Sequence, residues 1–160
     1  MNKVFPAVLV LTLVLVTAVR GADDTGSARS RADRCPVCGM YVAKYTDWHG
    51  MVVFDDSTQA VMDGPKDLFK YYLDIGKYNP SKSRERVTAV TVKDYYSKTT
   101  IDARKAYYVV WSDVYGPMGH EPIPFAHEAD AKKFLEEHKG RQIMRFKDIT
   151  LEVLWSLDNP

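Results

Sequence analysis

The 160-residue sequence contains only two cysteines, Cys35 and Cys38, and lacks an apolar run long enough for a permanent membrane anchor. Its longest apolar run, residues 8–19, ends at small residues. A bilayer span needs roughly 18–20 apolar residues, so this run is typical of a cleaved signal peptide. We therefore expect residues 1–22 to be removed on export to the periplasm. No cysteine lies near the expected cleavage site, so there is no lipobox cysteine to carry a lipid anchor.

The sequence also lacks an excess of charge, with 22 Lys and Arg residues against 21 Asp and Glu residues. Loss of residues 1–22 removes two basic side chains and leaves the mature chain near neutral. Nucleic-acid binding and strong membrane association both need a clustered positive field, so neither is expected. A phosphate-binding glycine loop, a nucleophile elbow and a metalloprotease helix are missing as well. These absences favour a protein that is not an enzyme.

The residue pattern predicts an α+β fold in which two related ββαβ units form one compact domain. Residues 23–34 are small, polar and charged, which is typical of a flexible leader, and the domain is expected over residues 35–160. The first unit is expected over about residues 46–103, with strands at 51–54 and 59–62, a helix from Pro65 to Gly76 and a strand at 86–96. The second unit, about residues 104–155, repeats this order with strands at 106–114 and 122–126, a helix at 127–140 and a strand at 141–146. Residues 151–155 are expected to add a short docking segment.

Cys35 and Cys38 form a C-x-x-C pair, a spacing that several kinds of site share. Covalent haem attachment is excluded because the residue after Cys38 is Gly39 and not histidine. A structural zinc site needs four ligands, and a second ligand pair at the usual spacing is missing. A thiol-disulfide oxidoreductase stays as the main alternative, although such enzymes place the first cysteine at the start of a helix that follows a strand. An inert disulfide is the third possibility, and so small a loop would stabilise the fold very little.

Two methionines offer thioether sulfurs as further soft metal ligands. In an extended segment residues i and i+2 point to the same face, so Cys38 and Met40 are expected to present a thiol and a thioether side by side. Met118 lies in a segment too rich in glycine and proline for a periodic core position, and His120 follows at the same spacing. Copper(I) prefers thiolate and thioether ligands to carboxylate or water. We therefore predict a copper(I) site formed by Cys38, Met40 and Met118, with Cys35 and His120 as further candidate ligands.

Four segments resemble the NosL family of nitrous-oxide reductase accessory proteins: CPVCGMYVAKY, DGPKDLFKYY, SDVYGPMGHEPIPF and EADAKKFLEEHKGRQIMRF. The resemblance implies an exported copper(I) chaperone built from two ββαβ halves, a fold also likened to organomercurial lyase. It implies delivery of copper to nitrous-oxide reductase, for its copper-sulfide centre, or to another copper client, with a membrane copper pump or another carrier as donor. It places the family's Cys-x-Met motif on Cys38 and Met40 and its later methionine on Met118. Members are commonly lipoproteins, whereas this chain lacks the lipobox cysteine.

Oxidation of Cys35 and Cys38 separates the copper carrier from the oxidoreductase and from the inert bridge. A disulfide should abolish copper(I) binding, because the thiolate is the ligand, and should leave the melting temperature nearly unchanged, because the closed loop is tiny. Copper(I) titration and thermal denaturation of the reduced and oxidised protein measure both effects. A large loss of thermal stability on reduction would make the pair structural. Turnover of a disulfide substrate faster than by a simple thiol would favour the oxidoreductase.

Overall fold

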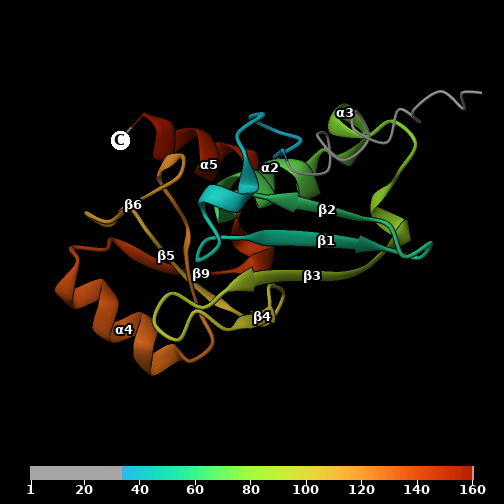
Figure 1. The fold of residues 1–160 in the computed structure, drawn as a ribbon. Coiled ribbons are helices and arrows are strands. Elements are labelled where there is room, and N and C mark those ends of the chain that lie inside the picture. The colour runs from blue at the N-terminus through green and yellow to red at the C-terminus, as the bar shows by residue number, and fades with distance from the viewer. Residues whose placement is uncertain (1–33, 160) are drawn as a thin grey trace, which may run out of the picture.

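The computed structural model describes residues 34–159, so the expected signal peptide and all of the expected leader except Arg34 lie outside the described residues. The described chain has an α+β fold, as predicted, with helices packed against antiparallel sheets (Figure 1). The short elements that connect the main ones are η1 (Val42–Lys44), α3 (Ile75–Tyr78), η2 (Arg84–Arg86) and η3 (Phe146–Asp148).

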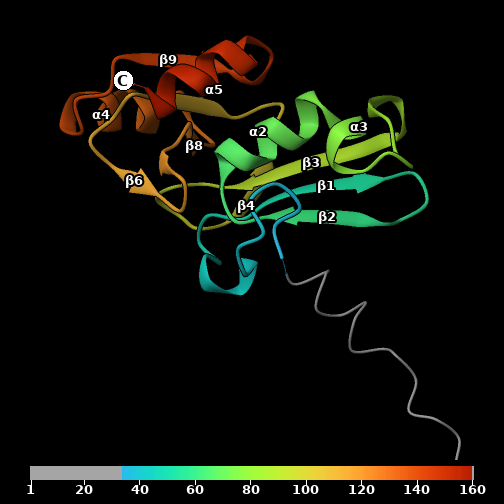
Figure 2. The same ribbon diagram turned by 90° about the horizontal axis from the view of Figure 1, so that it is seen from above.

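The first sheet has four antiparallel strands in the order β2-β1-β3-β4. They are β1 (Gly50–Phe54), β2 (Gln59–Met62), β3 (Val87–Lys93) and β4 (Thr100–Asp102). Buried positions alternate along β1, because successive side chains of a strand point to opposite faces. The buried face is covered by helix α2 (Pro65–Leu73), which lies along the sheet in Figure 2.

The second sheet has three antiparallel strands in the order β8-β5-β9. They are β5 (Tyr107–Val110), β8 (Ile123–Phe125) and β9 (Gln142–Arg145), and helix α4 (Glu128–Glu137) packs on them. A hairpin of β6 (Tyr115–Gly116) and β7 (Gly119–His120) is inserted between β5 and β8. Both halves thus run strand, strand, helix, strand, with the first strand in the middle of the three. That the two halves are related by duplication stays a prediction.

Helix α2 is the element that joins the two halves. Its Phe69 is fully buried, with its ring centroid 5.1 Å from that of Tyr108 in β5 and 4.9 Å from that of Phe146 in η3. The last helix, α5 (Leu151–Asp158), packs against α2 and contributes the buried residues Leu154 and Leu157 to the same core. The main core therefore surrounds α2, between the first sheet and α5.

Several sequence-based boundaries differ from the structure: the strand expected over residues 86–96 spans 87–93, and the helix expected over residues 127–140 spans 128–137. The helix expected to reach Gly76 ends at Leu73, because Asp74 leaves the helical conformation at φ −138° and ψ 60°. The strand expected over residues 106–114 ends at Val110, where Trp111 turns the chain with a φ of 57°. The expected short docking segment is the longer helix α5, which begins after Thr150 because its side chain accepts a hydrogen bond from the N–H of Val153.

Phe69→Ala should lower the free energy of unfolding by about 3–5 kcal/mol, because it removes a fully buried ring at the junction of the two halves. Trp155 provides a matched control, since this aromatic side chain in α5 is 68% exposed. Trp155→Ala should change the free energy of unfolding by no more than about 0.5 kcal/mol. Chemical denaturation followed by circular dichroism measures both values. Similar losses for the two variants would contradict the central position of α2 in the core.

Candidate metal centre

Two cysteines and two aspartates meet at one point of the fold. Cys35, Cys38, Asp63 and Asp67 each offer one ligand atom, and these four atoms lie within 4.8 Å of one another. The cysteines come from the turn that begins the described chain, and the aspartates come from the junction of β2 and α2. Two segments separated by more than twenty residues therefore form the cluster.

The turn of residues 34–41 fixes the two thiols. The N–H of Cys35 donates to Met40 O at 2.8 Å, and the N–H of Gly39 donates to Cys35 O at 2.9 Å. Gly39 has a φ of 78°, a conformation that glycine adopts without steric cost. The expectation of an extended segment here is wrong, because the chain turns at Gly39. Cys38 and Met40 are therefore not related by the alternation of a strand.

The start of α2 places the two carboxylates. Pro65 is the first helical residue, a position that suits its fixed φ and its missing N–H. Asp63 precedes it by two residues, and Asp67 lies in the first turn, where the helix dipole favours a negative charge. Both aspartates are 0% exposed. The helix start thus buries two carboxylates against the cysteine turn.

Each thiol donates a hydrogen bond to a different carboxylate, and all four groups lie close together. Cys35 Sγ donates to Asp67 Oδ2 at 3.3 Å, and Cys38 Sγ donates to Asp63 Oδ1 at 3.4 Å. Within residues 34–159 the other oxygen of each carboxylate, Asp63 Oδ2 and Asp67 Oδ1, is buried and has no hydrogen-bond partner. Buried polar atoms of folded proteins nearly always have a partner. Two such oxygens beside two thiols make a site that suits a cation.

The cluster keeps its thiols protonated when no metal is bound. Burial raises the pKa of Cys38 to about 12, and burial together with a neighbouring carboxyl raises the pKa of Cys35 further. Burial also raises the pKa of Asp67, and the charge of Asp63 adds to the effect. Redox-active cysteines have a lowered pKa, so this environment is unlike that of an oxidoreductase. A bound metal ion would reverse the preference by replacing the thiol protons.

Met40 belongs to the same turn as the thiols. Its carbonyl oxygen accepts the N–H of Cys35, and its Sδ lies 3.9 Å from the hydroxyl oxygen of Tyr45. The side chain is partly buried. The structure therefore holds Met40 close in the chain to the cluster, and its role as a ligand stays a prediction.

Met118 lies in the turn of the β6–β7 hairpin, and this hairpin docks on the start of α2. The Nζ of Lys66, the residue before Asp67, donates a hydrogen bond to Met118 O. The backbone of Met118 thus reaches the first turn of the helix that carries Asp67. His120 lies outside the cluster of four: its Nδ1 is 3.0 Å from Ser112 O and its ring packs on Tyr115. Ligand roles for Met118 and His120 stay predictions.

Asp63 and Asp67 were not among the ligands predicted from the sequence. The segment MDGPKD carries a usable signal, since two acidic residues four positions apart flank a proline that begins a helix directly after a strand. Such a junction fixes both side chains at one end of a rigid element. The segment gives no sign, however, that the cysteine turn packs against it.

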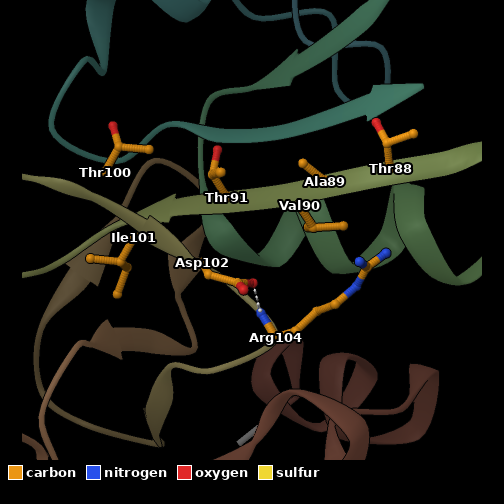
Figure 3. A pocket seen from close by; sticks show the side chains of 8 residues that line it. All are labelled: Thr88, Ala89, Val90, Thr91, Thr100, Ile101, Asp102 and Arg104. Carbon is orange, nitrogen blue, oxygen red and sulfur yellow. Dashed lines mark hydrogen bonds between the residues drawn. The ribbon is translucent and has the colours of Figure 1, made fainter. Parts of the chain in front are cut away.

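A separate hollow of about 270 Å³ lies along β3 and β4, as Figure 3 shows. Its lining includes Thr88, Thr91, Thr100, Asp102 and Arg104, and Asp102 Oδ1 accepts the backbone N–H of Arg104. The lining contains one carboxylate and no sulfur or imidazole. It has no ligand set for a soft metal, so the thiol–carboxylate cluster is the candidate metal centre.

Comparisons with known proteins agree on one family. The family model described as NosL matches residues 28–154. The chain is 29% identical over 131 residues to the copper-binding lipoprotein NosL of Stutzerimonas stutzeri, which covers 77% of this chain and 65% of that protein. It thus spans just under two thirds of the length of that relative. The crystal structure of the copper chaperone NosL from Shewanella denitrificans matches with a TM-score of 0.61 and 27% identity, over 74% of this chain and 90% of that one.

Within residues 34–159, no helix is both long enough and apolar enough to cross a bilayer.

Asp67→Asn should stabilise the metal-free protein at neutral pH. Because the folded-state pKa of Asp67 is raised, the buried group favours its protonated form, and stability is lost as the pH rises from the ordinary Asp pKa through the folded value. The amide carries no charge, and its oxygen can still accept from the Cys35 thiol. The gain in melting temperature should therefore be clear at pH 7 and shrink below about pH 4.

Thermal denaturation across this pH range measures the gain, with Asp47→Asn as a control at an exposed position. If Asp67→Asn is less stable than the parent at pH 7 while Asp47→Asn is unchanged, folding does not desolvate the carboxylate of Asp67 as assigned.

Proposed function

The chain belongs to the NosL family, and we propose that it is a copper(I)-binding chaperone that carries the metal and catalyses no reaction. One observation carries this proposal. Two thiols meet two buried carboxylates, and one oxygen of each carboxylate lacks a hydrogen-bond partner within the described chain. Relatives named as a copper-binding lipoprotein and as a copper chaperone support copper as the metal.

Sulfur ligands favour copper in its monovalent state. Thiolates and thioethers are soft donors, which copper(I) prefers to oxygen donors. We assign Cys38, Met40 and Met118 as the ligands, with Cys35 and His120 in reserve. Each thiol that binds copper(I) gives up its proton.

The two aspartates are placed to receive these protons. Asp67 Oδ2 lies 3.3 Å from the sulfur of Cys35, and Asp63 Oδ1 lies 3.4 Å from the sulfur of Cys38. The raised pKa of Asp67 makes its carboxylate a stronger base than an exposed aspartate. A proton that leaves a thiol can therefore pass to the neighbouring carboxylate. Copper(I) then offsets the charge of the thiolate, the carboxylate becomes neutral, and the buried site as a whole gains the single positive charge of the metal.

Copper transfer would proceed by ligand exchange. Cys35 is 2% exposed, whereas Cys38 is only partly buried. A sulfur or imidazole of an acceptor protein can approach a metal at Cys38 before the ligands of this chain release it. The ion then passes between proteins without becoming free in solution.

The setting that we propose for this exchange is the periplasm. The apolar run of residues 8–19 supports export, and one relative is named as a lipoprotein. We propose nitrous-oxide reductase as the client, with copper used for its copper-sulfide centre, and another copper protein as the alternative client. A membrane copper pump or a second carrier would supply the metal.

Zinc is a second candidate metal because of the carboxylates. Two cysteines and two aspartates provide four donors of the kinds that a tetrahedral zinc site uses. In that case Asp63 and Asp67 would be ligands themselves. The thiol-disulfide oxidoreductase has less support, since both thiols have a raised pKa where such an enzyme needs a lowered one.

A competition titration tests the proposal. The reduced protein should take up about one copper(I) per chain against a colorimetric chelator, and an equal concentration of zinc should not displace it. Cys38→Ser should lower the copper(I) affinity at least about a hundredfold, or ~2.7 kcal/mol, because a sulfur ligand is lost. Asp63→Asn, a control within the same cluster, should lower it less than about tenfold.

Displacement of copper by zinc, together with loss of zinc binding in Asp63→Asn, would identify the zinc site instead. A reduced parent protein that takes up neither metal would overturn the proposed function.

A further inference from the structure

Glu121 ties the β6–β7 hairpin to helix α2. It is 1% exposed, and its two carboxylate oxygens accept two backbone N–H groups. Oε2 accepts from Lys66 at 2.6 Å, and Oε1 accepts from Met118 at 3.0 Å. Since the two donors lie 52 positions apart in sequence, one buried side chain holds the turn with Met118 against the first turn of α2.

The chain leaves space for this carboxylate at two glycines. A Cβ atom on Gly64 would lie 2.8 Å from Glu121 Oε1, and one on Gly116 would lie 2.5 Å from Glu121 Cγ. Both distances are too short for real Cβ atoms. A glycine just before α2 and another in β6 therefore form the slot in which Glu121 lies.

Lys66 completes the connection from the other side. This lysine is 1% exposed, and its Nζ donates to Met118 O and to Asp158 Oδ1, the latter at 2.6 Å. The N–H of Met118 thus donates to Glu121, and its C=O accepts from Lys66. Both of these side chains are fixed at the start of α2. Asp158 ends α5, so the start of α2, the β6–β7 hairpin and the end of α5 lie together (Figures 1 and 2).

We propose that Glu121 and Lys66, together the polar clamp, are positioning residues that fix Met118 for binding copper(I) with the cysteine turn. The inference rests on the proposed function and deepens it. Neither residue is available as a ligand: both oxygens of Glu121 are occupied by N–H groups, and the ammonium of Lys66 is a cation that lacks a lone pair. They act on the metal through the backbone of Met118. Residue 66 directly precedes Asp67, so the clamp also sets the hairpin relative to the thiol–carboxylate cluster.

Glu121→Gln and Lys66→Met test the clamp. Glutamine offers one carbonyl oxygen where two N–H groups need acceptors, so one of these hydrogen bonds is lost. Methionine keeps most of the length of Lys66 and removes the ammonium. Both variants should lower the copper(I) affinity about tenfold. The X-ray absorption spectrum should show one copper–sulfur contact fewer than in the parent.

Lys70→Met is the matched control. Lys70 lies one turn further along α2 and also binds Asp158, at 3.2 Å, but it donates no hydrogen bond to Met118. Its removal should leave the copper(I) affinity and the copper–sulfur contacts as in the parent. This control separates positioning of Met118 from a general weakening of the contact between α2 and α5.

A Met118→Leu background distinguishes positioning from structure. If the clamp acts through the thioether, adding Glu121→Gln or Lys66→Met to Met118→Leu should change the copper(I) affinity by less than about twofold, because coupled residues are not additive. Parent-like affinity of both clamp variants would overturn the inference. So would the same tenfold loss in the Met118→Leu background.

Circular dichroism and thermal denaturation identify any variant that does not fold. Glu121→Gln leaves a buried N–H unpaired, so Lys66→Met decides the question if the glutamine variant is unfolded. Failure of the proposed function gives a different result, since Cys38→Ser would then bind copper(I) as the parent does. Loss of affinity in Cys38→Ser with none in the clamp variants would overturn the inference alone.

Discussion

The structure depends on how four ionisable side chains are buried around the start of α2. Asp63, Lys66, Asp67 and Glu121 are each at most 1% exposed. A buried charge is tolerated when it is paired and hydrogen-bonded, and it is costly otherwise. Lys66 and Glu121 have hydrogen-bond partners at every polar side-chain atom, whereas each aspartate keeps one oxygen without a partner in the described chain. The first two residues hold the hairpin and α5, and the two aspartates leave room for a cation.

This arrangement makes the metal-free site a source of instability. Burial raises the pKa of both thiols and of Asp67. The thiolate forms that bind a metal and the ionised form of Asp67 are therefore both disfavoured when no metal is bound. The donors also come from separate segments, so the unfolded chain cannot present them together. A ligand that binds only the folded state stabilises it. Metal binding and stability should therefore be coupled in this protein.

The local patterns of the sequence predicted the element types well. The strand expected at residues 59–62 matches β2 in both bounds, and the proline at the start of α2 marks the helix correctly. The errors lie where backbone geometry or tertiary contact decides. The positive φ of Gly39 makes a turn of a segment that was expected to be extended. Asp63 and Asp67 were missed because their importance comes from the distant cysteine turn, which no local pattern records.

The hairpin that carries Met118, a proposed ligand, is held in place by polar contacts of Glu121 and Lys66. Its two strands have two residues each, so its own ladder contributes little to its position. The polar clamp of Glu121 and Lys66 supplies the contacts that the ladder lacks. Because these hydrogen bonds are made to the backbone of Met118, they leave its side chain free for another partner. In the site that we propose, a thioether held in this way would bind and release a metal while the core around α2 stays packed.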